Sequence, residues 1–196
     1  MDAPTLHRRA VELWEARVSA VSDDQWEAGT PCTGWTVRDL VNHVVGEELW
    51  TAPLLEGSTI EQVGSRFDGD ILGDDPVATS HRAARTALDA VDENASARET
   101  VHLSYGDEST HEYLRQLAAD HLVHSWDLAV ATGGDPSLAP DVVDEVAVWF
   151  AGRESAYRAG GAIGPRVEVR GDTPTGDAQT ELLAAFGRDA RWAARV

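Results

Sequence analysis

Apolar side chains recur at helical spacing along most of this chain, and the clearest run lies between residues 110 and 132. No Gly or Pro interrupts it, and Gly133-Gly134 follows it. The apolar positions are Leu114, Leu117, Ala118, Leu122, Val123 and Leu128. This spacing predicts an amphipathic helix that ends at the glycines.

The same period predicts five further helices, at about 5–22, 36–52, 76–94, 140–157 and 179–186. Thr5 is the expected N-cap of the first. Thr36 followed by Asp39 resembles a capping box at the start of the second. Pro76 and Pro140 are favourable first residues for two others.

Two stretches do not follow the helical period. Residues 99–105 alternate apolar and polar side chains, which predicts a strand followed by a turn at Gly106-Asp107. Ser109-Thr110-His111 begins a return strand, or Thr110 caps the next helix. Residues 53–75 predict a long connection with one helical turn at 60–63, and such a connection could cover a pocket.

These elements predict an all-α fold. Four long helices joined by loops favour an antiparallel four-helix bundle, with a short β element before the fourth helix and a small C-terminal extension. No linker or internal repeat interrupts the sequence. We therefore expect a single domain over residues 1–196.

Charge and composition narrow the function classes. The 16 basic and 34 acidic side chains give a formal net charge of −18. Nucleic acid and anionic membrane surfaces require a basic footprint, so neither is an expected partner. The single Cys32 excludes an internal disulfide framework and suits a reducing cytosol. With no signal-peptide-like start and no apolar run of about 20 residues, we expect a cytoplasmic protein.

The helix at 110–132 carries candidate chemistry. Asp120 and His124 are four residues apart and therefore point the same way, with Asp127 continuing the stripe. His43 lies in the middle of the helix predicted at 36–52. In a bundle the two helices could face each other and bring these side chains together. Two imidazoles and a carboxylate suit a divalent metal and leave a position open for water or substrate.

Ordinary structural roles would also explain these residues. Asp120 could pair with an arginine, and His124 could cap or pack. A histidine among apolar positions, as His43 is, usually belongs to the core or its boundary. His121 lies about 100° around the helix from Asp120, so it is not assigned to the metal.

No catalytic or cofactor-binding residue stands out beyond the metal set. Glu47 is one turn from His43 and could orient it, although a solvated acid is the simpler explanation. It is the only acid or base near the metal that would favour hydrolysis. Cys32 lies in a Gly/Pro loop, and nothing adjacent in sequence marks it as an activated nucleophile.

Two longer strings resemble a known family. Residues 30–47, from Thr-Pro-Cys-Thr-Gly-Trp through His43, look like the first signature of the mycothiol-dependent maleylpyruvate isomerase metal-binding domain, a DinB-like four-helix bundle. Residues 120–129 resemble its second signature. Residues 164–169 and 182–189 resemble the ending of a subgroup described only as metal-binding proteins. The likeness runs over nearly the whole chain.

The resemblance implies that His43, Asp120 and His124 are the metal ligands. The implied metal is zinc, with nickel also seen among relatives. The isomerase pattern has Glu where Asp120 stands, and other DinB-like relatives have His. The isomerase also carries a further C-terminal domain that helps to bind its thiol cofactor, and too little chain follows the bundle here to form one.

The implied function is a metal-assisted thiol transferase or isomerase. It would activate a low-molecular-weight thiol such as mycothiol and present the thiolate to an electrophilic substrate. A non-catalytic metal-binding or stress-linked module and a metal-dependent hydrolase are the alternatives. Whether the protein is an enzyme, and whether it forms a homodimer, is left open.

Overall fold

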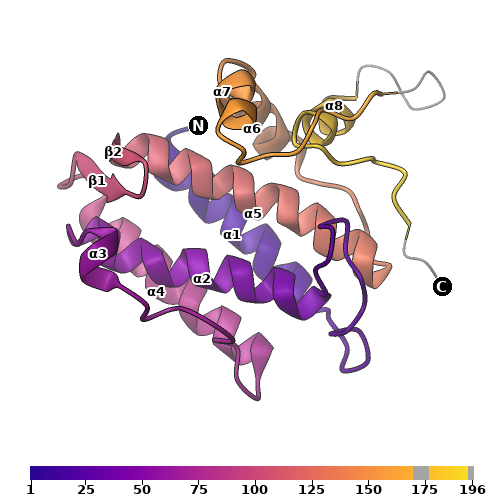
Figure 1. Cartoon of the computed structure of the whole chain (residues 1–196), viewed down its shortest axis with the longest axis horizontal. Coiled ribbons are helices and arrows are strands. Elements are labelled where there is room, and N and C mark those ends of the chain that lie inside the picture. Colours follow the sequence, from indigo (N-terminus) through magenta and orange to yellow (C-terminus); the bar gives the residue numbers. More distant parts are fainter. Residues whose placement is uncertain (170–176, 194–196) are drawn as a thin grey trace.

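The chain is mainly helical (Figure 1), and the computed structural model describes residues 1–169 and 177–193. Within them the helices are α1 (Ala3–Val18), α2 (Val37–Leu55), α3 (Ile60–Val63), α4 (Pro76–Asn94), α5 (Thr110–Thr132), α6 (Pro140–Ala151), α7 (Glu154–Ala159) and α8 (Ala178–Ala185). Strands β1 (Thr100–Leu103) and β2 (Gly106–Ser109) pair antiparallel ahead of α5. The prediction of a mainly helical chain with a short β element before the helix at 110–132 is confirmed.

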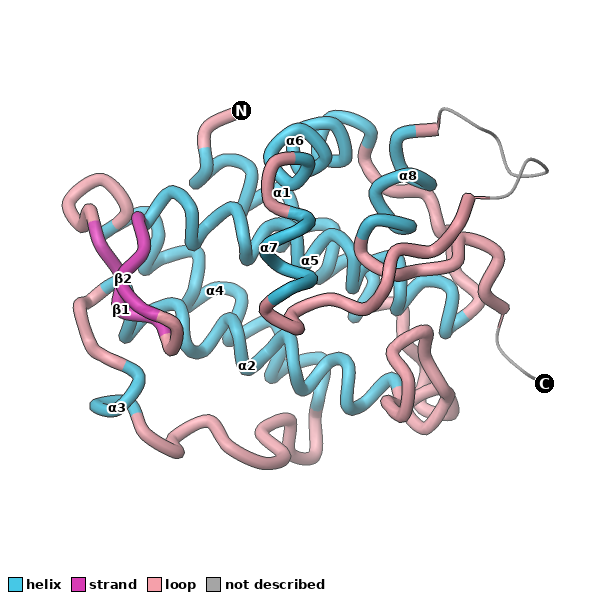
Figure 2. The backbone as a smooth tube through the Cα atoms, turned by 45° about the horizontal axis from the view of Figure 1, so that its top comes forward, coloured by secondary structure: helices cyan, strands magenta, loops and turns pink. Residues whose placement is uncertain are grey.

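Helix α5 is the centre of the packing. It lies against α1, α2 and α6, while α4 packs against α1 and α2 (Figures 1 and 2). Most of its side chains are therefore buried, including Leu114, Leu122 and Trp126. Helix α8 packs on α6 at the C-terminal side of the molecule. Among the described residues, no helix is both long and apolar enough to cross a membrane.

Local side-chain chemistry explains where the long helices begin and end. Thr36 and Asp39 form the predicted capping box of α2. Helix α4 begins at Pro76 and ends at Asn94, as predicted. Helix α5 ends at Gly133, whose φ of 71° is the left-handed conformation that glycine adopts without steric cost.

The first helix starts earlier than predicted. The N-cap of α1 is Asp2, whose Oδ1 accepts a hydrogen bond from the Thr5 backbone N–H at 2.8 Å. The assignment of Thr5 as the cap is therefore wrong. Aspartate is a strong N-cap, and the proline at the second helical position needs no backbone donor there.

Four other local features also differ from prediction. The helix expected over 140–157 is two helices, because the chain turns at Gly152 between α6 and α7. Helix α2 continues to Leu55 with Pro53 in its last turn. The hairpin turns at residues 104–105, and Ser109, rather than Thr110, caps α5 by accepting from the Glu112 N–H at 3.1 Å.

Candidate metal centre

The three side chains singled out from the sequence come together between α2 and α5. His43 Nε2 lies 3.3 Å from Asp120 Oδ2, and His124 Nε2 lies 3.4 Å from Asp120 Oδ1. The two imidazole rings are nearly perpendicular, with centroids 5.1 Å apart. One donor atom from each residue falls within 4.8 Å of the other two. The helical spacing of Asp120 and His124 and the position of His43 on the facing helix produce this convergence.

The chemistry of this donor set fits a divalent metal. Ligands bound tetrahedrally at about 2.0–2.1 Å from zinc lie roughly 3.3–3.4 Å apart, which matches the spacing of these donors. Asp120 Oδ2 is buried and makes no hydrogen bond of good geometry within the described residues, and its one close neighbour is the candidate ligand His43. Two imidazoles with one carboxylate favour zinc, nickel or iron over magnesium.

His124 is held from its other nitrogen by Asp127. Its Nδ1 lies 2.8 Å from Asp127 Oδ2, and the Asp127 side chain is fully buried. Arg188, in the segment after α8, donates from Nη2 to the same oxygen at 2.9 Å. When Asp127 accepts a hydrogen bond from the His124 Nδ1–H, the other nitrogen, Nε2, is free to act as the ligand atom.

The electrostatics of the site are strongly coupled. Burial alone would raise the pKa of Asp120, but the positive charges of His124 and His43 hold it well below its ordinary value. Burial alone would lower the pKa of His124, but Asp120 and the hydrogen bond with Asp127 raise it well above its ordinary value. The two shifts together favour an ionised Asp120 paired with a protonated His124.

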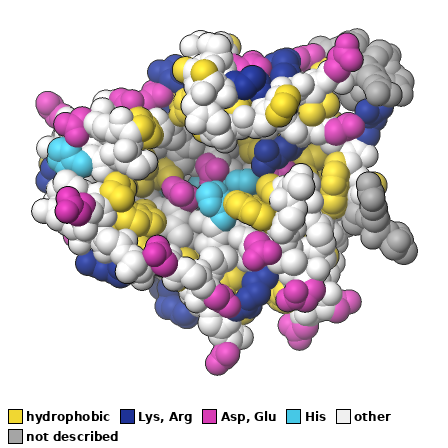
Figure 3. Space-filling model, in the orientation of Figure 1, with side chains coloured by type: hydrophobic (Ala, Val, Ile, Leu, Met, Phe, Trp, Pro, Cys, Tyr) yellow, Lys and Arg dark blue, Asp and Glu magenta, His cyan; other side chains and the backbone are white. Residues whose placement is uncertain are grey.

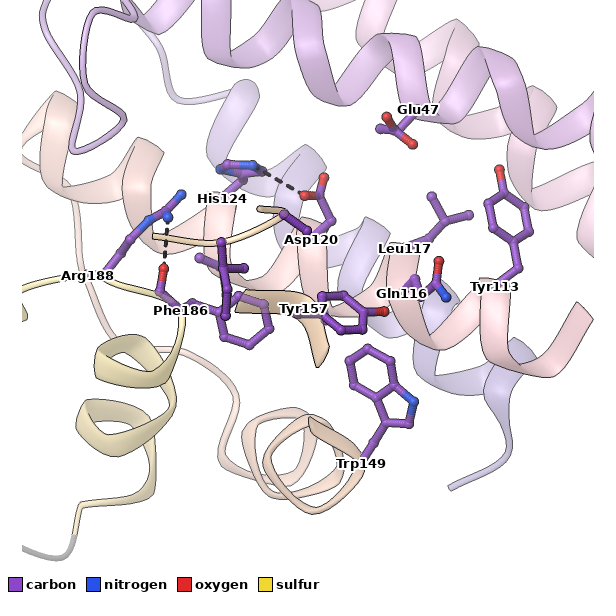
Figure 4. A pocket seen from close by; sticks show the side chains of 14 residues that line it. Glu47, Tyr113, Gln116, Leu117, Asp120, His124, Trp149, Tyr157, Phe186 and Arg188 are labelled. Carbon is purple, nitrogen blue, oxygen red and sulfur yellow. Dashed lines mark hydrogen bonds and ion pairs between the residues drawn. The ribbon is translucent and has the colours of Figure 1, made fainter. Parts of the chain in front are cut away.

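A cavity of about 330 Å³ opens beside these residues. In Figure 3, histidine and acidic side chains gather in a hollow near the middle of the face, with a basic side chain beside them. Asp120, His124 and Arg188 form one end of the cavity, as the close view in Figure 4 shows. Its wall is largely apolar and aromatic, formed by Leu117, Val123, Trp149, Tyr157, Ile163 and Phe186.

Glu47 and Tyr113 form the opposite end of the cavity (Figure 4). Burial, and then the charge of Asp120, raises the pKa of Glu47. The Tyr113 hydroxyl is buried and makes no hydrogen bond within the described residues. No hydrogen bond joins Glu47 to His43 in the described part of the chain, so Glu47 faces the cavity and does not orient that imidazole through a direct bond.

Trp35 covers the two histidines from the loop before α2. Its ring centroid lies 5.2 Å from that of His43 and 6.3 Å from that of His124. The loop is tightly closed, since the Thr30 N–H donates to the Trp35 carbonyl and the Trp35 N–H donates to the Cys32 carbonyl. The Trp35 indole therefore forms one side of the space that the candidate ligands His43 and His124 face.

Sequence patterns did not identify several of these neighbours. Asp127 was placed on the stripe with Asp120, and its i,i+3 spacing to His124 is the signal for its supporting role. Trp35 and Arg188 reach the site only through the tertiary fold. His121 points into the bundle interior, where its Nε2 lies 3.3 Å from Glu48 Oε1, which agrees with its exclusion from the metal set.

The connection at residues 53–75 does not cover the cavity, because none of the residues that line the cavity belongs to it. It is attached instead along the outer face of α2. The Asn42 amide donates to the Gly69 carbonyl and accepts from the Ile71 N–H, each at 2.9 Å, and Arg38 pairs with Asp70 at 2.8 Å.

Comparison with known proteins identifies one matching family and two similar proteins. The family model described as the mycothiol maleylpyruvate isomerase N-terminal domain matches residues 7–129. Two uncharacterised proteins of Mycobacterium tuberculosis, from strains CDC 1551 and H37Rv, are each 32% identical over 203 residues, covering 97% of this chain and 100% of the relative. No solved structure matches the chain. The range matched by the family model contains all three candidate ligands.

Proposed function

This chain belongs to the family of the mycothiol maleylpyruvate isomerase N-terminal domain, and we propose that it binds a divalent metal ion through His43, Asp120 and His124. We propose further that the site activates a low-molecular-weight thiol as a transferase or isomerase. Zinc is the proposed metal, with nickel as the alternative. Mycothiol is the first candidate thiol, because the description of the family names it.

One observation carries this proposal: the three donors converge, and two of them, Asp120 and His124, line a cavity that has room for a small substrate. A metal bound there would supply Lewis-acid chemistry, lowering the pKa of a bound thiol so that it is a thiolate at neutral pH. The apolar wall would hold the carbon skeleton of an electrophile and exclude water.

The chain's own polar groups have distinct tasks in this proposal. Asp127 orients His124 by accepting a hydrogen bond from its Nδ1–H. Glu47 lies across the cavity, and its raised pKa favours the protonated carboxyl, which could exchange a proton with a substrate. The buried Tyr113 hydroxyl, for which the described residues offer no hydrogen bond of good geometry, is available to donate to a substrate oxygen.

A metal-dependent hydrolase is the second candidate, and Glu47 is the observation that favours it. A carboxylate facing the metal ligands across a cavity is the group that would take a proton from an attacking water. A binding module without chemistry would need no such acid or base. The fate of a thiol in the presence of the protein separates the three functions.

The proposal includes the arrangement of the whole chain. We propose that α1, α2, α4 and α5 constitute a DinB-like four-helix bundle, because each packs against two of the others. Residues 1–196 would form a single domain, since apolar side chains of α6 and α8 join the core formed by α1 and α5.

Metal content and thiol consumption test the function together. Elemental analysis of the purified protein should give about one equivalent of zinc or nickel, and His43→Ala or His124→Ala should remove it. His102→Ala is the matched control, because His102 lies on β1, pairs with Asp107 and is remote from the cavity. Full metal retention in both site variants would refute the three-ligand site.

The metal-loaded protein should then be incubated with mycothiol and an electrophile such as maleylpyruvate or an epoxide. A transferase consumes thiol and electrophile together, whereas an isomerase converts maleylpyruvate with no net loss of thiol. A protein that holds metal but changes neither compound is a binding module. Hydrolysis of an ester panel that persists without thiol and disappears in Glu47→Gln would establish the hydrolase instead.

A further inference from the structure

Arg188 brings a positive charge to the metal centre from outside the range that the family model matches. It follows α8, and its guanidinium lies beside His124 at the end of the cavity (Figure 4). Nε donates to Asp127 Oδ1 at 3.1 Å and Nη2 donates to Oδ2 at 2.9 Å. Nη1 donates to the Phe186 carbonyl at 3.0 Å, which fixes the guanidinium plane. Two parallel bonds to one carboxylate determine the orientation of that carboxylate.

The orientation of Asp127 determines that of His124. Asp127 Oδ2 receives both the Arg188 Nη2 bond and the His124 Nδ1 bond. Because Asp127 is fully buried, water does not replace either partner. Arg188 therefore acts on the imidazole through Asp127 and turns Nε2 toward Asp120 and His43.

A second set of metal-type donors lies on the other edge of the same imidazole. Cys32 Sγ is 3.3 Å from Asp127 Oδ2 and 3.9 Å from His124 Nδ1. One donor from each of these residues falls within 4.8 Å of the other two. A thiolate, an imidazole and a carboxylate would suit zinc as well as the first set does, and would suit softer metals better.

Arg188 already lies against this second set. Its Nη2 is 3.3 Å from Cys32 Sγ and 2.9 Å from Asp127 Oδ2. The guanidinium thus bonds two of the three donors that a metal ion would need. A fixed positive charge at that distance also repels a divalent cation.

We propose that Arg188 selects which edge of His124 binds the metal: it positions Nε2 for the site with His43 and Asp120, and it closes the Cys32 edge to metal ions. Arg188 is a positioning residue, since it acts through Asp127. The inference rests on the proposed metal site and adds that Arg188 keeps the ion at that site.

Cobalt(II) is the probe, because a cobalt–thiolate bond gives a sulfur-to-metal charge-transfer band that oxygen and nitrogen ligands do not give. The wild-type protein, freed of metal, should bind about one equivalent with no such band. Arg188→Met should bind cobalt roughly 10–100-fold more weakly at the original site, as is usual when the support of a metal ligand is lost. It should also develop the band, and Cys32→Ser in the Arg188→Met background should abolish it.

Arg166→Met is the matched control. Arg166 also forms ion pairs in the C-terminal part of the chain, with Glu154 at 3.0 Å and Glu181 at 2.6 Å, but it does not line the cavity. It should leave both cobalt affinity and spectrum unchanged. A purely structural role for Arg188 would not create a thiolate band.

Each outcome decides the question. Wild-type affinity and spectrum in Arg188→Met would refute the inference while leaving the metal site intact. A charge-transfer band in the wild type, or lost affinity in Cys32→Ser alone, would show that the Cys32 edge holds the ion. If Arg188→Met does not fold, Arg188→Lys must weaken cobalt binding without a band for the inference to stand. A wild-type protein that binds no cobalt overturns the proposed site and this inference together.

Discussion

His7 is predicted to make the protein less stable as the pH falls. The imidazole lies on α1, fully buried, and neither ring nitrogen has a hydrogen-bond partner within the described residues. Its nearest ring is that of His121, in an edge-to-face contact at 5.8 Å. Burial, reinforced by His121 and Arg8, lowers the pKa of His7 from 6.5 to about 3.

The sign follows from proton binding. Between pH 3 and 6.5 the unfolded chain protonates this histidine and the folded chain does not, so protons favour unfolding over that range. Each pH unit costs about 1.36 kcal/mol for one proton. Since half of the unfolded chains are already protonated at pH 6.5, the contribution of His7 to the free energy of unfolding should fall by about 1.6 kcal/mol from pH 6.5 to pH 5.

His7→Leu isolates this contribution, because the variant keeps a side chain of similar size and cannot be protonated. Urea unfolding of both metal-free proteins, followed by far-ultraviolet circular dichroism, gives their unfolding free energies at pH 7.5, 6.5 and 5. The stability of the variant relative to the wild type should rise by about 1.6 kcal/mol between pH 6.5 and 5. Titrating groups that do not interact with His7 or with its neighbour His121 are common to both proteins and cancel in the difference.

His7→Phe is the control for packing. It should shift the stability difference by a constant amount and show the same change with pH as His7→Leu. A difference between wild type and His7→Leu that stays constant from pH 7.5 to 5 would refute the assignment of His7 as a neutral buried histidine.

Three other substitutions probe the remaining framework by urea denaturation. Asp127→Asn removes the charge that Arg188 faces in a buried pair, so the unfolding free energy should fall by about 3–5 kcal/mol; a loss near zero would mean that the pair is solvated. Gly57→Ala should cost about 1–3 kcal/mol, because Gly57 has a φ of +96° and an added Cβ would lie 2.7 Å from the Arg98 guanidinium; an unchanged midpoint would contradict this strain. Thr36→Ala removes the N-cap of α2 and should cost about 1 kcal/mol, most of which Thr36→Ser should restore.

The sequence was most informative where local chemistry decides the structure. Helix α4 and the Gly133 stop of α5 followed from Pro and Gly, and the start of α2 followed from the Thr36 capping box. The region 140–157 was wrongly predicted as one helix, since its apolar period continues past Gly152 although the chain turns there. A hydrophobic period shows which side chains of a segment are buried, but it does not show whether the backbone stays helical throughout.

The candidate site was likewise predicted best where local sequence spacing determines it. Asp120 and His124 were paired by spacing on one helix. His43 was added because a bundle could place its helix opposite, and the resemblance named the same three residues. The buried pair of Glu48 and His121 and the approach of Arg188 depend on contacts between residues 61 or more positions apart. No local pattern carries such contacts, so they could not be predicted from a single sequence.

Two aspartates on α5 flank His124, and their surroundings give them different roles. Both lie one turn from the imidazole, Asp120 at i−4 and Asp127 at i+3, so sequence spacing alone cannot distinguish ligand from support. Asp127 is fully buried, and both of its oxygens accept hydrogen bonds from Arg188. Asp120 is about one-third exposed, has an oxygen without a hydrogen bond and borders the cavity. This difference supports Asp120 as the proposed metal ligand and Asp127 as its support, because Arg188 already bonds both oxygens of Asp127.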